Sequence, residues 1–377
     1  MKIAHIITTL GDGGAERTLF NICKNNNQIH NQVVISLLNQ GKYGELITKL
    51  GIKLYYLNMK PNIFFIFKIF TLIKILFNEK PDIVQTWMYH SDFFGSIAAR
   101  LAGIKNIFWN IRHADHQKNQ TNPKTIWILK ILTKFSWWLP KKIIVNSKKS
   151  INIHKELGYC KKKLIYIPNG YDLSLLKPKN KYIVSIRKKL NLKNKIPLIG
   201  FVGRYYPEKD HFNLLNALYL LKNQKIDFFC VLVGKNINYK NEKLINNIKK
   251  LGLEKNIKLM GSQKNIISLM SELDLHILSS NSESFPNVVA EAMACQTPCI
   301  VTDVGDAAYI VGKTGWVVPS KNPLLLAKIT IKAISEIGTK RWKKRCIDAR
   351  LRIQKNFHID RMVNSYNKTW SKIFYKN

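Results

Sequence analysis

The chain has 377 residues, more than one hydrophobic core usually supports, so we expect two domains of ordinary size. Hydrophobic residues make up 46% of it, which excludes a largely disordered protein. Lysine and arginine total 61 against 23 acidic residues, and the formal net charge is +38. The basic residues are scattered, without an arginine-rich arm or a nucleic-acid-binding module, so nucleic acid is not an expected partner. An anionic membrane surface or a genomic bias toward lysine and asparagine would explain the charge.

Strand-like and helix-like segments alternate along the chain, which argues for parallel, doubly wound sheets with helices on both faces. In a first domain, residues 1–170, the expected strands are 3–8, 33–38, 53–57, 81–87, 107–111, 142–146 and 165–168. Lysine-rich residues 171–195 are expected to form a linker with a short helix. In a second domain, residues 196–355, the expected strands are 198–202, 228–233, 257–260, 274–278 and 299–302, and a helix at 356–377 ends the chain.

Signals for secretion or for spanning a membrane are not found in the sequence. The first residues lack the apolar run and cleavage site of a signal peptide, and the six cysteines are dispersed like buried thiols of a reducing compartment. Residues 63–77 are too short to span a bilayer and are interrupted by lysines. They form either a packed helix or a basic, aromatic helix on a membrane surface. Residues 126–139 mix tryptophans with lysines and leave the same two interpretations open.

Two glutamates stand eight positions apart within residues 279–291. The apolar run before Glu283 is typical of a buried strand, and the alanine- and methionine-rich run around Glu291 is typical of a helix. Pro286 and Asn287 suit the start of that helix. Ligands of open α/β sheets bind where such a strand ends, and a helix start offers N–H groups to a diphosphate. The second carboxylate could accept the two hydroxyls of a ribose.

The wider segment, from Glu-Ser-Phe-Pro-Asn-Val-Val-Ala-Glu at 283–291 to Gly-Trp-Val-Val-Pro at 315–319, resembles the signature of family-4 (group 1) retaining glycosyltransferases of the bacterial cell-surface polysaccharide type. The resemblance implies an α/β GT-B fold: two Rossmann-like, doubly wound parallel-sheet domains facing across a cleft, with the helix 356–377 crossing back to the first. It places Glu283 beside the donor sugar and Glu291 on the nucleotide ribose. The segment between them would bind the sugar and phosphate through Ser284, Phe285, Pro286, Asn287 and Val288.

A glycine-rich turn, Gly11-Asp-Gly-Gly-Ala-Glu, follows the first expected strand. The dinucleotide fingerprint needs a glycine where Glu16 stands, and the next strand ends without a ribose-binding acid, so a nicotinamide cofactor is not expected. A tight glycine turn still lets the backbone approach a phosphate. The turn resembles the first loop of many family-4 enzymes, which would place Gly13 and Gly14 beside the donor phosphates and the acceptor.

Two cations follow the first strand of the second domain. Arg204 and Lys209 are able to neutralise a diphosphate leaving group, or simply to form surface salt bridges. Their spacing resembles the phosphate clamp of the family, and the family reads the base near Lys264 and Ile266. The sequence has no Asp-x-Asp motif, so we expect no metal and no further cofactor, and the two cations and the helix start would compensate the charge.

Polar residues also follow strands of the first domain. His113 stands where family-4 enzymes often place a histidine against the donor sugar, which implies a catalytic role beside Glu283. Arg112 and His116 could serve the acceptor instead. Tyr89 and His90 follow the preceding strand and are expected on the acceptor side.

These motifs predict a retaining glycosyltransferase that moves a sugar from a nucleotide-diphosphate sugar, UDP-hexosamine or UDP-hexose by preference, to a hydroxyl of a lipid-linked or growing surface polysaccharide such as lipopolysaccharide or capsule. The leaving phosphate is able to take the acceptor proton, so no protein nucleophile is required. We expect a cytoplasmic protein associated peripherally with the anionic inner face of the membrane. A sugar-nucleotide epimerase on the same scaffold and a basic nucleic-acid-binding protein are the alternatives.

Overall fold

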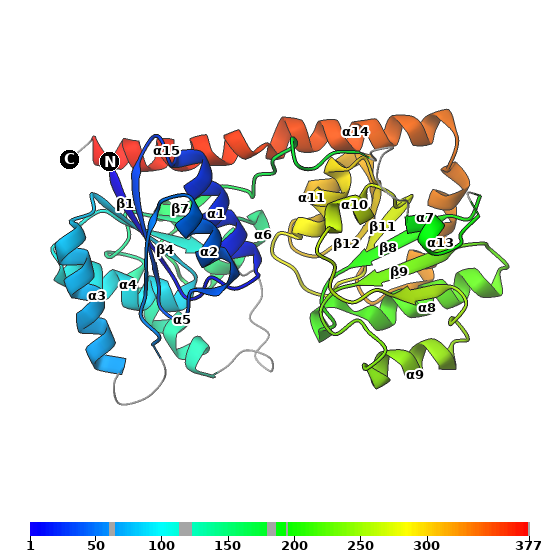
Figure 1. Cartoon of the computed structure of the whole chain (residues 1–377), viewed down its shortest axis with the longest axis horizontal. Helices are drawn as coiled ribbons and strands as arrows, with labels where there is room; N and C mark the ends of the chain where they lie inside the picture. The colour runs from blue at the N-terminus through cyan, green and yellow to red at the C-terminus, as the bar shows by residue number, and fades with distance from the viewer. Residues whose placement is uncertain (60–64, 113–122, 179–185, 194, 376–377) are drawn as a thin grey trace. The chain divides into compact units, whose positions relative to one another are not determined.

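The computed structural model describes residues 1–59, 65–112, 123–178, 186–193 and 195–375, and the chain forms two compact units (Figure 1). The first, which we call unit 1, consists of Met1–Gly170 and Ile359–Asn377. The second, unit 2, consists of Tyr171–His358. The chain therefore leaves unit 1 after Gly170 and returns to it for its last helix.

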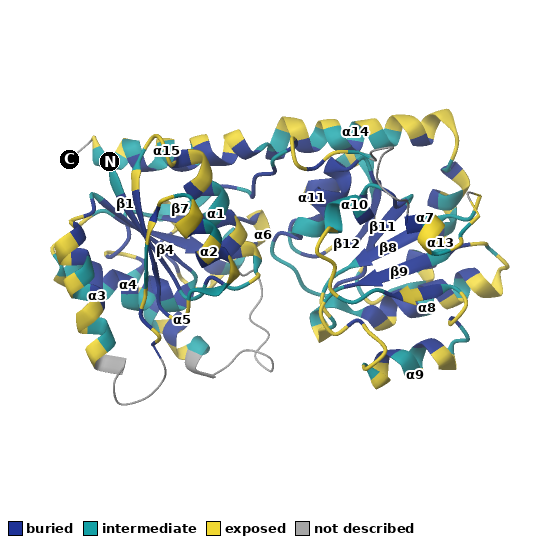
Figure 2. Cartoon of the chain, in the orientation of Figure 1, coloured by how far each residue is buried: buried dark blue, intermediate teal, exposed yellow. Residues whose placement is uncertain are grey.

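The described part of unit 1 contains a seven-stranded parallel sheet with the strand order β3-β2-β1-β4-β5-β6-β7. Most strands are runs of buried residues (Figure 2), as expected when helices cover both faces of a parallel sheet. The strands are β1 (Lys2–Ile7), β2 (Asn31–Ser36), β3 (Lys53–Tyr56), β4 (Ile83–Trp87), β5 (Ile107–Ile111), β6 (Lys142–Val145) and β7 (Leu164–Tyr166). The α-helices are α1 (Gly14–Asn26), α2 (Gly41–Lys49), α3 (Phe65–Glu79), α4 (Tyr89–Leu101), α5 (Pro123–Phe135), α6 (Lys148–Glu156) and α15 (Ile359–Phe374).

Alternate residues of each strand pack on opposite faces of this sheet. Ala4 and Ile6 of β1 belong to a core shared with α3, α4 and α5, whereas Ile3 and Ile7 belong to a core shared with α1, α2 and α15. The buried residues of α15 recur at helical spacing, so they form one apolar stripe, and this stripe packs on unit 1. These residues are Ile359, Met362, Val363, Tyr366 and Trp370.

The described part of unit 2 contains a six-stranded parallel sheet with the strand order β10-β9-β8-β11-β12-β13. The strands are β8 (Leu198–Val202), β9 (Phe229–Val233), β10 (Ile257–Leu259), β11 (Leu275–Leu278), β12 (Cys299–Thr302) and β13 (Trp316–Val318). The α-helices are α7 (Ile186–Lys189), α8 (His211–Asn223), α9 (Glu242–Lys250), α10 (Ile266–Met270), α11 (Asn287–Ala294), α12 (Ala307–Val311), α13 (Pro323–Glu336) and α14 (Lys340–Phe357). The edge strand β13 was not among the strands expected from the sequence.

Two parallel, doubly wound sheets confirm the fold class predicted from the sequence. The described residues of the 171–195 segment, which was expected as a linker, also contribute to the packing of unit 2. Tyr171, Leu173 and Leu176 lie in the same core as Phe285, and Ile186 of α7 is buried against Leu198. Tyr171 donates its backbone N–H to the carbonyl of Phe357 at 2.9 Å, so this segment lies along the end of α14.

In the described part of the chain, no helix is both long and apolar enough to span a bilayer. The six cysteines are free thiols, and all except the partly exposed Cys346 are buried. Burial raises the pKa of Cys346 to about 11, so even this thiol stays protonated near neutral pH.

Candidate functional site

The strand order of unit 2 changes direction between β8 and β11. β9 and β10 lie on one side of β8, whereas β12 and β13 lie beyond β11 on the other. Ligands of open parallel sheets bind outside the carboxyl ends of the strands at such a switch point. Arg204 and Lys209 follow β8, and Glu283 follows β11. The predicted donor-binding residues therefore belong to the two loops that flank this point.

Lys209 and Glu283 form an ion pair between these two loops. Ser280 Oγ donates to the same carboxylate oxygen, Oε1, at 2.8 Å. The lysine and glutamate side chains are 19% and 12% exposed, so the pair is sheltered from bulk water but accessible. Among the described residues, all polar contacts of the Glu283 carboxylate go to Oε1. The other oxygen, Oε2, is therefore available to a ligand hydroxyl.

Hydrogen bonds to the backbone hold the two loops together. Ser279 Oγ donates to the carbonyl oxygens of Lys209 and Asp210, at 3.1 and 3.0 Å, and the N–H of Asn281 donates to the carbonyl of Glu208 at 2.8 Å. Asp210 has a φ of 44° and its side chain caps α8. The turn that carries Lys209 is therefore fixed at both ends, which positions its ammonium group before a ligand arrives.

The loop after β12 supports the Glu283 loop from a third side. Gly305 has a φ of +52°, and a Cβ there would lie 2.4 Å from the carbonyl oxygens of both Glu283 and Ser284. The N–H of Asp306 donates to the Ser284 carbonyl at 2.9 Å. Glycine is therefore required at position 305 both by the backbone conformation and by the close approach of the two loops.

The side chains around the start of α11 point into unit 2. Phe285 is buried and packs edge-on against Phe357, with ring centroids 5.7 Å apart. The hydroxyl of Tyr171 donates to Asn287 Oδ1 at 2.6 Å. The predicted contribution of Phe285 and Asn287 to sugar or phosphate binding would therefore come from backbone groups.

Glu291 lies one turn after the start of α11. Pro286 is the N-cap, and the first N–H groups of a helix, including that of Val288, have no partner within the helix. Glu291 is 5% exposed. A carboxylate near a helix N-terminus interacts favourably with the positive end of the helix dipole. These features suit the predicted ribose contact, which remains a prediction.

Arg204 is exposed on the loop after β8. Its guanidinium lies over the Tyr206 ring, 5.2 Å from the centroid. No described acidic residue forms an ion pair with it, so the guanidinium can bind an anion. The close packing behind this loop requires glycine, because a Cβ at Gly234 would lie 2.1 Å from the carbonyl oxygen of Gly203.

The two residues predicted near the base follow β10. Lys264 is exposed, and Ile266 is half-buried at the first position of α10. Asn265 between them caps the helix by accepting the N–H of Ser268 at 3.0 Å. A half-buried apolar side chain beside an exposed cation suits the edge of a nucleotide base, but neither contact is tested by the structure.

Glu272 and Asp274, the carboxylates whose spacing comes nearest to an Asp-x-Asp motif, both bind other residues of unit 2. Glu272 accepts the backbone N–H of Ile186 at 3.0 Å through both carboxylate oxygens. Asp274 pairs with Arg187 and accepts the N–H of Leu198 at 2.7 Å. Among the described residues, no three His, Cys, Asp or Glu side chains come together as candidate metal ligands.

Unit 1 has its own switch point, between β1 and β4. Gly13 is the N-cap of α1 and Gly14 its first residue. A Cβ at Gly13 would lie 2.4 Å from Glu16 Oε2, so the carboxylate of Glu16 covers the turn. Burial raises the pKa of this carboxyl above its usual value. Met88, after β4, has φ 71° and ψ 158°, a conformation that non-glycine residues adopt mainly at functional sites.

Arg112 joins several segments of unit 1. Its guanidinium donates to the side chains of Asn110 at 2.9 Å, Thr18 at 3.3 Å, Tyr366 at 3.0 Å and Asn169. The same group therefore connects β5, α1 and α15 with the segment before Gly170. Arg112 was predicted as an acceptor residue, and any such contact would have to use its one remaining N–H donor.

The other residues predicted on the acceptor side differ in their surroundings. Tyr89 is buried, and its hydroxyl shares a hydrogen bond of 2.8 Å with His154 Nε2. His90 is partly exposed, and burial lowers the pKa of its imidazole. His113 and His116 lie outside the residues that the structure describes, so their predicted roles remain predictions.

The sequence matches two family models that together span most of the chain. The model described as "Glycosyltransferase Family 4" matches residues 12–175. The model described as "Glycosyl transferases group 1" matches residues 183–347. The second match contains the Arg204, Lys209 and Glu283 segments, and the first contains the Gly13 turn.

Two curated relatives are similar over much of the chain. The "UDP-Gal:alpha-D-GlcNAc-diphosphoundecaprenol alpha-1,3-galactosyltransferase" of Escherichia coli is 28% identical over 62% of the chain, and the match spans 61% of that relative's length. The "N,N'-diacetylbacillosaminyl-diphospho-undecaprenol alpha-1,3-N-acetylgalactosaminyltransferase" of Campylobacter jejuni is 25% identical over 72% of the chain and 73% of its own length.

A solved structure shares the whole fold. HepE of Anabaena, crystallised in complex with UDP-glucose, superimposes with a TM-score of 0.86 at 22% identity and covers 99% of this chain and 100% of its own. The same protein was also crystallised with UDP alone, and that structure gives the same TM-score. These likenesses confirm the predicted GT-B fold.

Proposed function

Because the chain belongs to the family-4, group 1 glycosyltransferases, we propose that it transfers a hexose or N-acetylhexosamine from a UDP-sugar to a lipid-linked or growing surface polysaccharide, with retention of configuration at the anomeric carbon. The observation that carries the proposal is the Lys209–Glu283 pair at the switch point of unit 2, with Lys209 on the same loop as Arg204, which pairs with no described acidic residue. The donor preference is supported by HepE, which binds UDP-glucose, and the acceptor class by the names of the two bacterial relatives.

The proposed chemistry breaks the bond between the anomeric carbon and the β-phosphate oxygen. Negative charge then grows on the departing UDP while positive charge grows on the sugar ring. Lys209, Arg204 and the N-terminus of α11 stabilise the negative charge, in place of a metal ion. The acceptor hydroxyl forms the new bond on the same face of the sugar and gives its proton to the departing phosphate oxygen. The nucleotide leaves as UDP, and no covalent enzyme intermediate is formed.

The ion pair gives the two side chains complementary roles in donor binding. A diphosphate near Lys209 competes with Glu283 for the ammonium group. The carboxylate then accepts a sugar hydroxyl through Oε2, the oxygen that no described residue uses. Glu283 therefore orients the sugar while Lys209 holds the leaving group. We assign Glu291 to the ribose, Lys264 and Ile266 to the base, and His113 to the sugar.

The acceptor residues are assigned to unit 1. Gly13 and Gly14 form the turn that approaches phosphate or acceptor, and His90 and His116 are the polar candidates for binding the acceptor. A lipid-linked acceptor places the reaction at the cytoplasmic face of the membrane, and the net charge of +38 favours an anionic surface.

Thermal unfolding with nucleotide sugars tests the donor assignment. A ligand that binds only the folded protein, at a free concentration a hundred times its Kd, raises the free energy of unfolding by about 2.7 kcal/mol. We expect UDP-sugars to raise Tm more than GDP- or ADP-sugars, and Arg204→Ala and Glu291→Ala to reduce that shift. Lys243→Ala, which removes an exposed cation on α9, is the control and should retain it. Equal shifts for the parent and both site variants would contradict the proposed site.

Incubation with UDP-sugar in the absence of acceptor separates the transferase from the epimerase. Without acceptor, an epimerase either converts the sugar and leaves the nucleotide linkage intact, or it releases free sugar. The transferase needs the acceptor for efficient release of UDP. Retention of DNA or RNA that is unaffected by Glu291→Ala would instead favour the nucleic-acid-binding alternative.

A further inference from the structure

Aromatic side chains on α3, on α5 and directly after α5 are exposed to solvent on one face of unit 1. α4 packs between α3 and α5, and all three cover the same face of the sheet. One side of α3 is exposed, whereas Leu72 and Leu76 on its other side are buried (Figure 2). The outer side chains are 60–65% exposed aromatics, together with Leu101 at the end of α4, which is 68% exposed. We call this surface the α3–α5 face, and its aromatic residues are Phe67, Phe70, Phe77, Trp127, Trp137 and Trp138.

Lysines lie between the aromatics on both outer helices. On α3, exposed Lys74 lies between Phe70 and Phe77, one turn from each. On α5, exposed Lys130 and Lys134 lie between Trp127 and the tryptophans that follow the helix. Each helix therefore presents one solvent-facing stripe that is aromatic at both ends and cationic in the middle.

Acidic side chains do not balance these lysines. The sequences of the three helices contain two carboxylates, Glu79 and Asp92, and both are buried. Glu79 pairs with Lys2 at 2.8 Å and with Lys53 at 2.7 Å. A stripe that served only to solubilise a helix would mix both signs of charge, so this composition needs a different explanation.

The aromatic residues on α4 and α5 are fixed by contacts among themselves. The ring of Phe93 meets Trp127 edge-on at 6.3 Å and stacks on Phe135 at 6.1 Å. Phe135 in turn meets Trp138 edge-on at 4.9 Å. Trp137 donates its indole N–H to the carbonyl of Gly158 at 3.2 Å. The tryptophans are therefore held in exposed positions, which lowers the entropy cost of placing them in a partner.

A cavity adjoins the C-terminal ends of α3 and α4. Its volume is about 470 Å³, within the range of ligand-binding pockets. The cavity is lined by apolar atoms and by exposed Lys80 and Lys105, and also by Asp82, whose carboxylate accepts the backbone N–H of Lys2 at 2.7 Å. The two exposed lysines in this lining suit an anionic headgroup.

From these observations we infer that the α3–α5 face docks on the surface of a bilayer that contains anionic phospholipid. Tryptophan and phenylalanine rest at the headgroup boundary, and lysines bind anionic headgroups while their alkyl chains cover apolar surface. Each lysine near such a surface adds attraction that salt weakens. The inference rests on the proposed function in one respect, since a lipid-linked acceptor is the reason for the protein to be at a membrane.

Co-sedimentation of the full chain with lipid vesicles tests the charge. The probe is vesicles of equal parts phosphatidylglycerol and phosphatidylcholine, compared with phosphatidylcholine alone. The triple variant Lys74→Glu/Lys130→Glu/Lys134→Glu should partition onto the anionic vesicles at least about tenfold more weakly than the parent. Lys243→Glu/Lys249→Glu/Lys250→Glu changes the net charge equally on exposed positions of α9 and should bind like the parent. Equal losses of vesicle binding in the two variants would mean that only net charge matters, and the α3–α5 face would not be the docking surface.

A second pair of variants tests the aromatic residues. Phe67→Ser/Phe70→Ser/Trp127→Ser should also partition about tenfold more weakly, whereas Tyr239→Ser/Leu324→Ser, at exposed positions of unit 2, should not. Sedimentation velocity without vesicles tests whether a second copy of the chain covers the face instead. A concentration-dependent dimer of the parent that the aromatic variant abolishes would identify the face as a contact between copies, and the bilayer inference would be wrong.

Donor binding separates this inference from the proposed function. The UDP-sugar shift in Tm should be the same in all four variants, because none of the changed residues belongs to the donor site. If both variants of the α3–α5 face bind vesicles like the parent while the UDP-sugar shift is normal, the membrane inference is wrong and the proposed transferase function stands. If UDP-sugars give no shift while vesicle binding follows the face, the donor assignment is wrong and the face stands.

Discussion

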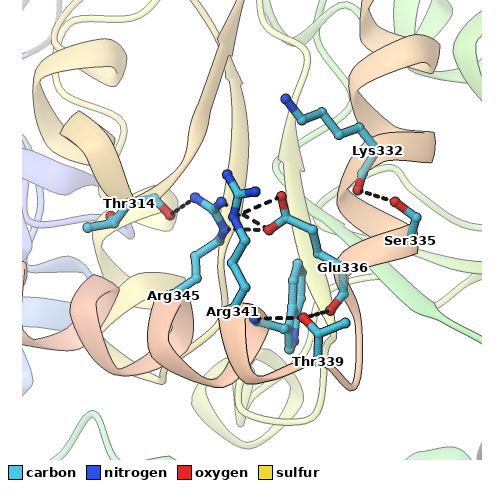
Figure 3. A network of polar contacts seen from close by, with 8 residues as sticks. Thr314, Lys332, Ser335, Glu336, Thr339, Arg341 and Arg345 are labelled. Atoms are coloured by element: carbon cyan, nitrogen blue, oxygen red, sulfur yellow. Dashed lines mark hydrogen bonds and ion pairs between the residues drawn. The ribbon is translucent and has the colours of Figure 1, made fainter.

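Two carboxylates of unit 2, Glu336 and Glu283, are both paired with cations, but their pairing differs. Arg345 donates to Glu336 Oε2 from Nε at 3.2 Å and from Nη2 at 3.0 Å, and Arg341 Nε lies 3.5 Å from Oε1 (Figure 3). The Arg345 guanidinium also stacks 4.0 Å from the centroid of the Trp316 ring. Both oxygens of Glu336 are used by rigid, planar donors.

The Glu283 pair has the opposite properties. Its partner is a lysine, a point charge on a flexible chain, and only one carboxylate oxygen is used by described residues. It also lies at a switch point of the sheet, whereas Glu336 ends α13 beside the start of α14. A saturated pair fixes two helices, and a half-saturated pair at a strand end can exchange partners with a ligand. The distinction is testable by substitution.

Lys209→Met should give the largest effect, in catalysis. Without the ammonium group the departing diphosphate loses its stabilising charge, and kcat/KM should fall about a hundred- to a thousandfold. The melting temperature of the ligand-free protein should change less than in Glu336→Ala, because the Glu283 carboxylate keeps its hydrogen bond from Ser280 Oγ. Steady-state assays with UDP-sugar and acceptor measure the first quantity and calorimetry the second. A stable protein with normal kcat/KM would contradict the role of Lys209.

Glu336→Ala should give the converse result. Its removal leaves Arg345, 12% exposed, without its carboxylate, and the free energy of unfolding should fall by about 3 kcal/mol. The kcat/KM of the folded fraction should be unchanged. Urea unfolding measures the loss. Should Glu336→Ala reduce turnover of the folded enzyme as strongly as Lys209→Met, the contrast between the two pairs would be lost.

Arg204→Ala should have a smaller effect, confined to the donor. A hydrogen bond to a charged group contributes about 1.5–3 kcal/mol, so the UDP-sugar should bind about ten- to a hundredfold more weakly. Arg204→Lys keeps the charge but not the planar fork and should recover part of the affinity. Isothermal titration measures both variants. If lysine and alanine at this position bind the donor alike, the charge of Arg204 is not used.

The smallest effect concerns pH and a third carboxylate, Glu79 of unit 1, which is saturated like Glu336. Hydrogen bonds from Lys2, and then from Lys53 and Tyr55, lower the pKa of Glu79 from 4.5 to about 2. Because the folded pKa is the lower one, its contribution is complete above about pH 4.5 and disappears as the pH falls through about 2. Discounted for solvent screening, it is about 1–2 kcal/mol.

Urea unfolding of the parent and of Glu79→Gln over this pH range measures the contribution of Glu79. The difference in stability between the two proteins should shrink as the pH falls. A difference that stays constant down to the acid end would show that the carboxylate is not the group responsible.

Sequence patterns could place the predicted donor residues in the fold because these residues stand next to secondary-structure boundaries. A buried strand followed by a helix start places Glu283 at a strand end, and the same argument places Lys209 after β8. The pairing of Lys209 with Glu283 was beyond such reasoning, because 74 positions separate them. Only the strand order, which puts β8 next to β11, brings the two loops together.

Residues with distant partners were the least predictable. Arg112 contacts Asn169 and Tyr366, at separations of 57 and 254 positions, and neither contact leaves a local signal. Glu16 was noted only because it breaks the dinucleotide fingerprint. Its position three residues after Gly13, at a helix start, is the spacing from which its carboxylate covers the turn. That spacing could have identified it as a candidate site residue.

The attachment of α15 to unit 1 has a consequence for synthesis on the ribosome. Tyr366 and Trp370 are fully buried in unit 1, where the indole N–H of Trp370 reaches Gln85 Oε1 at 3.1 Å. Unit 1 therefore cannot finish its fold when its first 170 residues emerge, whereas unit 2, an uninterrupted stretch of chain, has no such delay. At about 5–20 residues per second, the nascent first half waits roughly ten seconds or longer with an uncovered apolar surface. A chaperone that binds apolar surface would protect the nascent chain during that interval.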